Sequence, residues 1–127
     1  MNETDKKGSW NRSLGLFGEE ETVRYLQRRG YRILCRNYRC RFGEIDIIAE
    51  ETLTDTLCFI EVKTRSGFQK GRPCEAVNET KMKHIKLTAH HFLSSQRISE
   101  VKLRVDVAEI VRLEKRCYIR YTKNVTF

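Results

Sequence analysis

The chain has 127 residues, 39% of them hydrophobic, a length and composition that predict a single folded domain with a sizeable core. Its 25 lysines and arginines exceed its 17 acidic residues, and the formal net charge of +8 favours a polyanionic partner such as a nucleic acid. The sequence has no signal-peptide pattern and no long apolar run, which excludes the secreted and membrane-spanning classes and predicts a cytoplasmic protein.

Residues 1–12 are polar, and we expect them to form a flexible tail before a single domain that covers residues 13–127. A helix is predicted from Leu16 to Arg29, with Gly30 as its C-cap.

Glu19 falls on the apolar stripe of this helix, because it follows Leu16 by three positions and precedes Val23 by four. A carboxylate on a buried helical face needs a partner or a function. Glu19 is therefore a candidate functional residue.

Three strands are predicted after the helix, at residues 31–38, 43–50 and 56–65. The second and third contain GEIDIIAE and TLCFIEVKTR, and the short turn between them predicts an antiparallel hairpin. The next segment, SGFQKGRP at 66–73, contains two glycines and a proline and predicts a loop.

A second helix is predicted over residues 75–94, where apolar side chains recur at a spacing of three to four. Alternating apolar residues predict a half-buried strand at 101–110, and CYIRY at 117–121 closes a last hairpin. The order helix, three strands, helix, two strands predicts an α/β fold of the α+β type, a mixed sheet with helices packed on it.

Two charged pairs lie within the predicted hairpin. Glu44 and Asp46 are two residues apart in one strand, and Glu61 and Lys63 are two apart in the other, so each pair points to one side of its strand. Pairing of the strands brings Asp46 and Glu61 together at one end of the sheet. Two carboxylates there suit Mg²⁺, and Lys63 can then orient the attacking water in a phosphate reaction.

The alternative interpretation is that these charges form cross-strand ion pairs on a solvated face, each contributing roughly 0.2–1 kcal/mol. The flanking residues weigh against it, because both strands are apolar on more than one face, as in a central strand. Charges are costly there unless they are functional or fully paired. The apolar flanking residues are Ile45, Ile47, Ile48, Phe59, Ile60 and Val62.

The cysteines and histidines predict no second metal site. The five cysteines show no CxxC motif and no pairing with histidine at zinc-ligand spacing, and they are expected to be reduced, partly buried thiols. The three histidines match no ligand pattern, and His90 and His91 are expected at the surface or its boundary.

GEID, followed fifteen residues later by EVK, resembles the motif of the PD-(D/E)xK nuclease superfamily. In that superfamily an acid and an ExK group lie on adjacent strands of a restriction-endonuclease-like core. Residues 15–112 resemble, more narrowly, the YraN-like family of small bacterial proteins. The segments that carry this resemblance are GEEETVRYLQRRGYRIL, NYRCRFGEIDIIAE, FIEVKTR, GRPCEAVNETKMKHIKLTAHHFL and LRVDVAEI.

The resemblance implies roles for five residues. Asp46 and Glu61 are implied to bind the metal ion, Mg²⁺ or Mn²⁺, and Glu19 to join them from the first helix. Lys63 is implied to complete the catalytic ExK group. Glu44, on the same face as Asp46, is implied to support the site.

Three basic residues are implied to contact nucleic acid. Lys81 fits the family's second helix, whose basic face is a candidate phosphate contact, and Arg65 and Arg104 are weaker candidates of the same kind. The implied partner is DNA rather than RNA, branched or otherwise structured by analogy with Holliday-junction resolvases. The same analogy implies a homodimer.

The expected function is that of a metal-dependent endonuclease that hydrolyses phosphodiester bonds of DNA. A second hypothesis is a non-catalytic nucleic-acid-binding accessory protein that retains the nuclease fold. A third is a protein-interaction domain whose acidic residues pair for structural reasons.

Overall fold

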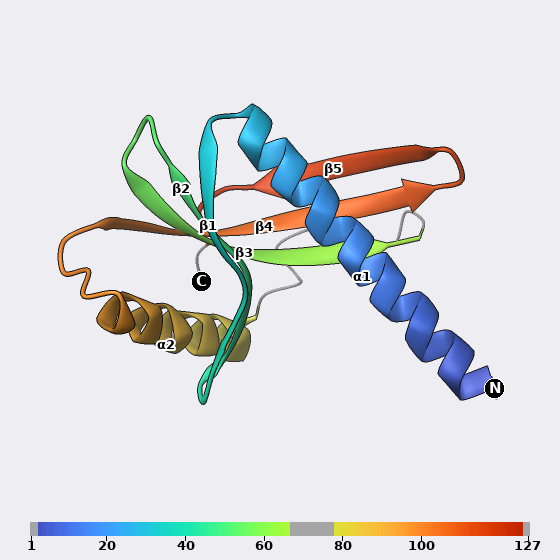
Figure 1. The fold of residues 1–127 in the computed structure, drawn as a ribbon, viewed down its shortest axis with the longest axis horizontal. Coiled ribbons are helices and arrows are strands. Elements are labelled where there is room, and N and C mark those ends of the chain that lie inside the picture. Colours follow the sequence, from blue (N-terminus) through green and yellow to red (C-terminus); the bar gives the residue numbers. More distant parts are fainter. Residues whose placement is uncertain (1–2, 67–77, 126–127) are drawn as a thin grey trace.

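The computed structural model describes residues 3–66 and 78–125. Within these ranges two helices and five strands follow one another in the predicted order (Figure 1). The elements are α1 (Glu3–Arg28), β1 (Tyr31–Cys40), β2 (Gly43–Glu51), β3 (Thr56–Arg65), α2 (Glu79–Ser95), β4 (Lys102–Leu113) and β5 (Arg116–Thr122).

The strands form one mixed sheet in the order β1-β2-β3-β4-β5. β3 and β4 are parallel, and the other neighbouring pairs are antiparallel, including the predicted hairpins. Helix α2 lies in the connection between β3 and β4, because parallel strands need a crossover that a tight turn cannot provide. A mixed sheet with two helices is consistent with the predicted restriction-endonuclease-like core.

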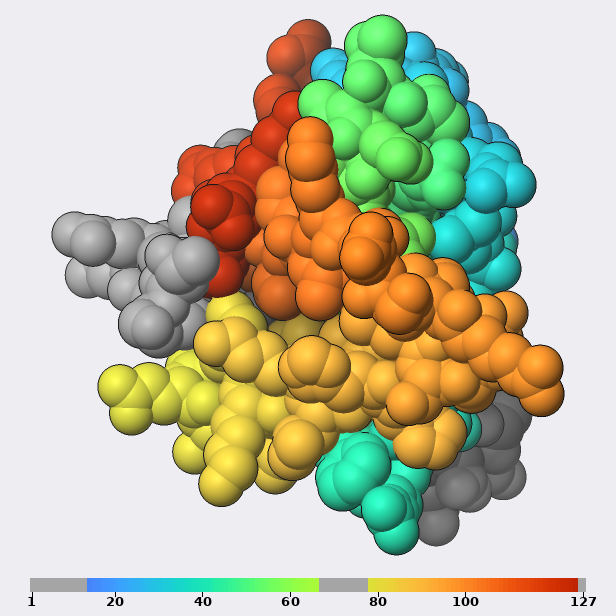
Figure 2. All heavy atoms as spheres, turned by 90° about the vertical axis from the view of Figure 1, so that its left-hand side faces the viewer, coloured from blue at the N-terminus to red at the C-terminus, as the bar shows by residue number. Residues whose placement is uncertain are grey.

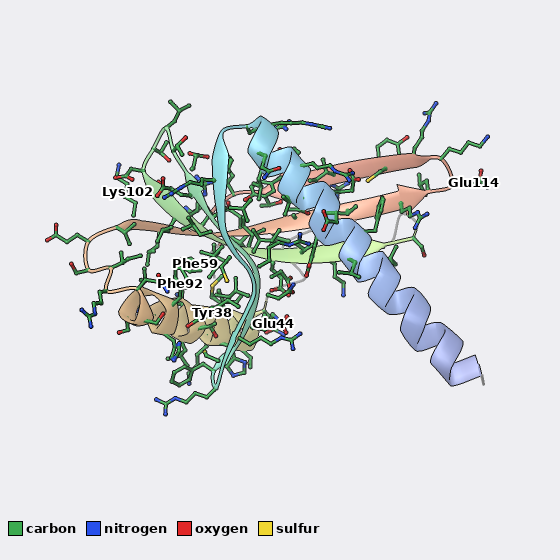
Figure 3. The ribbon with its side chains drawn as sticks, in the orientation of Figure 1. Tyr38, Glu44, Phe59, Phe92, Lys102 and Glu114 are labelled. Atoms are coloured by element: carbon green, nitrogen blue, oxygen red, sulfur yellow. The ribbon has the colours of Figure 1, made fainter. Side chains whose placement is uncertain are left out.

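The two helices pack against opposite faces of the sheet. On one face Leu26 of α1 packs in a core that includes Ile60. On the other face Phe92 of α2 makes edge contacts with Phe59 and Tyr38, at ring-centroid distances of 6.2 and 5.3 Å (Figure 3). Phe59 and Ile60 are consecutive, so β3 supplies side chains to both cores, as expected of a central strand.

Helix α1 begins at Glu3 rather than at Leu16, so residues 3–12, for which the sequence predicts a flexible tail, are helical. Polar residues do not prevent a helix, and this segment contains no proline. The helix ends at Arg28, and Gly30 then adopts a φ of +82°, which glycine reaches without steric cost. The predicted glycine C-cap is confirmed.

Helix α2 begins after Asn78, whose side-chain Oδ1 accepts a hydrogen bond from the N–H of Lys81 at 2.8 Å. This N-cap satisfies one of the free N–H groups of the first turn. The second predicted helix is thus confirmed from residue 79. Residues 75–77, and residues 67–73 of the predicted loop, lie outside the described residues.

Strand β4 differs from its predicted half-buried pattern. Residues 106–111 are all buried, and they include Asp106 and Glu109. β4 lies between β3 and β5 and is covered on both faces along this stretch, so alternation along the strand no longer separates core from solvent.

Other predictions concern thiols, histidines and membrane segments. Among the described cysteines, Cys35 and Cys40 are partly buried and Cys58 is buried, whereas Cys117 is exposed, contrary to the expected burial; Cys74 lies outside the described residues. The three histidines are exposed on α2. Among the helices of the described ranges, none is long and apolar enough to cross a membrane.

Candidate functional site

The pairing of β2 with β3 ends where the predicted site begins. The last paired residues are Ile47 and Ile60, and beyond them β2 continues with β1 alone as a two-stranded ribbon that leaves the rest of the sheet (Figure 1). Asp46 and Glu61 are the next residues in this register. They therefore lie at the point where the two strands separate.

The side chain of Asp46 hydrogen-bonds to β3 at the position where the backbone of β2 no longer does. Its Oδ2 accepts a hydrogen bond from the backbone N–H of Val62 at 2.8 Å. A strand that separates from its neighbour leaves N–H groups that need another acceptor. The bond holds Asp46 against β3, with Glu61 and Lys63 on either side of Val62 in the chain.

Helix α1 reaches the site through a close approach at Gly18. A Cβ atom at this position would lie 1.8 Å from Oγ1 of Thr64, so only glycine fits without a shift. The next residue, Glu19, lines a hollow of about 340 Å³ together with Asp46 and Lys63. The structure thus brings together three predicted site residues from three elements.

Two side chains of β1 hold the carboxylate of Glu19. Arg36 Nη2 and Asn37 Nδ2 each donate to Glu19 Oε2 at 3.3 Å, and the Glu19 side chain is only 13% exposed. Asn37 has a φ of +54°, a left-handed conformation that asparagine adopts more readily than most residues. Nothing in the spacing of Arg36 and Asn37 separates them from other polar strand residues, so the sequence does not predict their role.

The carboxylate of Glu61 is held from the other face of the sheet. Lys81, in the first turn of α2, places its Nζ 3.2 Å from Glu61 Oε1. The Glu61 side chain is 17% exposed and that of Lys81 is 41% exposed. The predicted phosphate contact therefore lies directly beside a predicted metal ligand.

Burial and neighbouring charge change the protonation of Asp46. Burial, the main cause, and the charge of Glu61 together raise the pKa of its carboxyl from 3.8 to about 7. Glu19 and Glu44 add to this effect, whereas the hydrogen bond from Val62 opposes it. A cation among these acids would favour their charged forms.

The pKa of Glu61 is also raised. Burial is the main cause, and the charge of Glu44 adds to it, whereas the ammonium groups of Lys81 and Lys63 lower it. Glu44 itself is 40% exposed and lies 3.3 Å from Nε of Arg39. Its negative charge thus raises the pKa of both Asp46 and Glu61.

The donor atoms of the site suit a hard divalent cation. Asp46, Glu61 and Glu19 offer carboxylate oxygens, the ligands that Mg²⁺ and Mn²⁺ prefer. Within the described residues, no three acidic, histidine or cysteine side chains already converge on one metal position. Glu19 is turned toward Arg36 and Glu61 toward Lys81, so shared coordination requires these contacts to loosen.

Arg65 lies next to a buried acid, Glu109, that was not among the predicted site residues. Its Nε is 4.0 Å from Oε1 of Glu109, and Glu109 is the neighbour of Lys63 in the β3–β4 register. Among the described residues, Arg65 Nε and Glu109 Oε2 are buried without a hydrogen-bond partner. The burial of Glu109 is predictable from the sequence, because Glu109 continues the alternating positions of Val105 and Val107 that are predicted to be buried.

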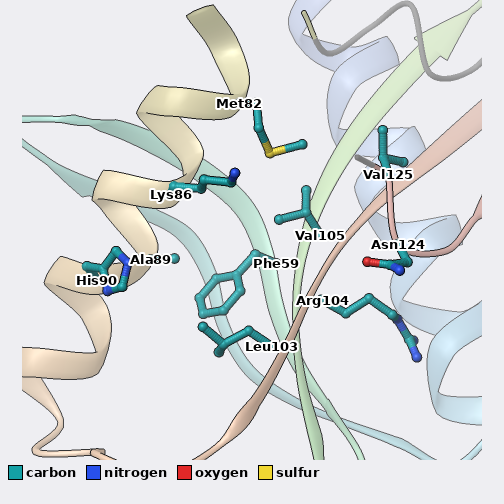
Figure 4. A pocket seen from close by; sticks show the side chains of 10 residues that line it. All are labelled: Phe59, Met82, Lys86, Ala89, His90, Leu103, Arg104, Val105, Asn124 and Val125. Carbon is teal, nitrogen blue, oxygen red and sulfur yellow. The ribbon is translucent and has the colours of Figure 1, made fainter. Parts of the chain in front are cut away.

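The structure does not bring Arg104 to the other candidates. Its Nε donates to Asp106 Oδ1 at 2.9 Å and its Nη2 donates to the hydroxyl of Tyr31 at 2.7 Å. Arg104 also lines a second hollow of about 350 Å³, between α2 and β4, whose floor includes Phe59. Figure 4 shows its guanidinium pointing away from α2.

Comparison with known proteins identifies the family. A family model described as "Uncharacterised protein family UPF0102" matches residues 18–110, which include Glu19, Asp46, Glu61 and Lys63. The chain is 47% identical to a UPF0102 protein of Alkaliphilus oremlandii over 116 residues, 90% of this chain and 97% of that protein.

Two further relatives give the same result. The chain is 46% identical to a UPF0102 protein of Caldicellulosiruptor saccharolyticus over 99 residues, 78% of this chain and 82% of that protein. It is 42% identical to one of Clostridioides difficile over 106 residues, 84% of this chain and 91% of that protein. The chain therefore belongs to the UPF0102 family, the YraN-like family that its segments resemble.

Proposed function

We propose that the protein is a divalent-metal-dependent nuclease that hydrolyses phosphodiester bonds of DNA. The observation that carries the proposal is the position of Asp46 and Glu61 at the separation of β2 and β3, beside Lys63. Burial and the charge of Glu61 raise the pKa of Asp46, and clustered, partly buried carboxylates of this kind are expected where a cation is to be bound.

Each residue of the site has a chemical role in this proposal. Asp46 and Glu61 hold Mg²⁺ or Mn²⁺, and Glu19 assists from α1. The bound ion supplies Lewis-acid polarisation of the phosphate and of a water molecule. Lys63, which is exposed, donates to a phosphate oxygen and orients the water for in-line attack. The water oxygen bonds to phosphorus and releases a proton to solvent as the bond to the leaving oxygen breaks, and the leaving oxygen takes up a proton from solvent.

The basic surface supports a nucleic acid as the partner. Arg39 and Arg41 are exposed near the tip of the β1–β2 ribbon, and this tip lies beside α2 (Figure 2). Lys83 and Lys86 are exposed on α2. A two-stranded ribbon has the width to enter the major groove of duplex DNA. A branched or structured DNA and a two-fold assembly belong to the proposal through the analogy with junction resolvases.

Cleavage and metal binding test the proposal together. Wild type and Lys63→Ala are incubated with Mn²⁺ and a panel of linear, flapped and four-way DNA and of RNA. Calorimetric titration with Mn²⁺ compares wild type with an Asp46→Ala, Glu61→Ala double variant. We expect cleavage of at least one DNA, a loss of about 100-fold or more in Lys63→Ala, and Mn²⁺ binding that the double variant abolishes. Equal Mn²⁺ responses of wild type and the double variant would refute the metal site.

A second candidate function is a non-catalytic nucleic-acid-binding protein. The observation that favours it is that Glu19 and Glu61 already have cationic partners, Arg36 and Lys81. In that case DNA binding survives Lys63→Ala and no member of the panel is cut. Failure to bind DNA or RNA at low salt, where counterion release contributes most, would contradict both candidates.

A further inference from the structure

The ion pair between Lys81 and Glu61 brings an ammonium group next to a carboxylate of the proposed metal site. The two charged atoms are 3.2 Å apart. Lys81 lowers the pKa of Glu61 against the effect of burial, so its charge favours the ionised carboxylate. The charge that a divalent cation would bring to Glu61 is thus partly supplied by the protein itself.

The position of Lys81 is fixed by its helix rather than by chance contact of two long side chains. The backbone N–H of Lys81 donates to the N-cap side chain of Asn78 at 2.8 Å. This holds Lys81 in the first turn of α2, the positive end of the helix dipole, beside an acid of β3. The side chain itself is 41% exposed, so its ammonium group has a route to solvent.

We propose that Lys81 is the counter-ion of Glu61 in the metal-free protein, and that a divalent cation displaces it so that it can contact a phosphate of the bound nucleic acid. This inference rests on the proposed function, because it assumes that Glu61 binds a metal ion. It assigns to Lys81 the role of a positioning residue that couples metal binding to nucleic-acid binding.

The two halves of the proposal make opposite predictions for one variant. Lys81→Met removes the competing cation and keeps a side chain of similar length, so it binds Mn²⁺ more tightly than wild type, by about threefold for a partly exposed pair. The same variant binds duplex DNA in Mn²⁺ more weakly, because one phosphate contact is lost. A change that only disturbed the fold would weaken both.

The experiment measures Mn²⁺ affinity by calorimetry and DNA affinity by fluorescence anisotropy. Lys102→Met, an exposed lysine at the start of β4 and away from α2, is the control and leaves Mn²⁺ affinity unchanged. Lys81→Met is also combined with Glu61→Gln, and in this double variant it no longer alters Mn²⁺ affinity relative to Glu61→Gln alone. Circular dichroism confirms that each variant is folded.

The outcomes separate this inference from the proposed function. Tighter Mn²⁺ binding and weaker DNA binding by Lys81→Met support the exchange. If wild type binds Mn²⁺ and Lys81→Met binds it equally or more weakly, the exchange is overturned but the metal site is not. Absence of Mn²⁺ binding in wild type and in Lys81→Met overturns the metal site and the exchange with it.

Discussion

The carboxylate of Asp46 accepts a hydrogen bond from the backbone N–H of Val62 at the position where β2 stops pairing with β3. One side chain thus ends the ladder between two strands and lines the hollow that Glu19 and Lys63 share. The two strands therefore separate at the same place where Asp46 and Glu61 lie. This relationship can be tested by variants that keep the hydrogen bond and remove the charge.

Asp46→Asn keeps an acceptor for Val62 and removes the ionisable group. In metal-free wild type, the unfolded carboxyl loses its proton near pH 3.8 and the folded one near pH 7. The unfolded state therefore holds fewer protons between these values, and the free energy of unfolding falls as pH rises from about 4 to 7. Asp46→Asn lacks this fall and is more stable than wild type at pH 8, by at most ~4 kcal/mol.

Urea unfolding between pH 4 and 8, with a chelator present, measures this difference. Asp55→Asn, at an exposed turn, is the control and follows wild type. If Asp46→Asn shows the same decline with pH as wild type, burial of the Asp46 carboxyl does not set the protonation of the site.

Asp106 is the centre of a buried polar network in the sheet. Its carboxylate is fully buried and accepts hydrogen bonds from Arg104, from the hydroxyl of Tyr121 at 2.6 Å and from the backbone N–H of Asn124 at 2.9 Å. Asp106→Asn leaves the positive charge of Arg104 without its nearest counter-charge and lowers the free energy of unfolding by ~3–5 kcal/mol.

Tyr121→Phe removes only one donor to the same carboxylate and costs ~1 kcal/mol. Glu50→Gln, which alters a pair with the exposed Arg32, changes stability by less than ~1 kcal/mol. Chemical denaturation of the three variants gives the comparison. A loss for Asp106→Asn no larger than that of Glu50→Gln would show that the network contributes little.

Gly18 sets the distance between α1 and β3. Gly18→Ala forces a methyl group against Thr64 and destabilises the fold by ~1–3 kcal/mol, although alanine favours the helix itself. Gly15→Ala, with nothing within 4 Å of the added Cβ atom, instead stabilises by up to ~1 kcal/mol.

Thermal unfolding distinguishes the two glycines. Thr64→Ala, combined with Gly18→Ala, removes the nearest clashing atom and recovers part of the lost stability. Equal effects of Gly18→Ala and Gly15→Ala would contradict the close approach that brings Glu19 to the site.

Arg41 tests the contribution of the β1–β2 ribbon to DNA binding. The residue is exposed, and its guanidinium lies 4.7 Å from the ring centroid of Phe42. Arg41→Ala is expected to reduce the slope of log affinity against log salt by about 1, the loss of one phosphate contact. Arg32→Ala, at the opposite end of β1, is the control, since a ribbon-specific contact leaves its slope unchanged. Anisotropy titrations on duplex DNA at several salt concentrations measure both.

The sequence by itself determined the element order, the hairpin of β2 and β3 and the Gly30 cap, and it placed Asp46 and Glu61 near each other on neighbouring strands. These features follow from local rules, since alternation, turn length and capping act over a few residues. Glu19 was also identified from the period of one helix.

Only the tertiary structure decided how these residues meet. It fixed where β2 separates from β3, how closely α1 approaches β3 at Gly18, and that Lys81 forms an ion pair with Glu61. It also buried Asp106 on a strand that the sequence predicts to be half solvated. These outcomes depend on contacts between segments far apart in the chain, and local sequence rules do not contain that information.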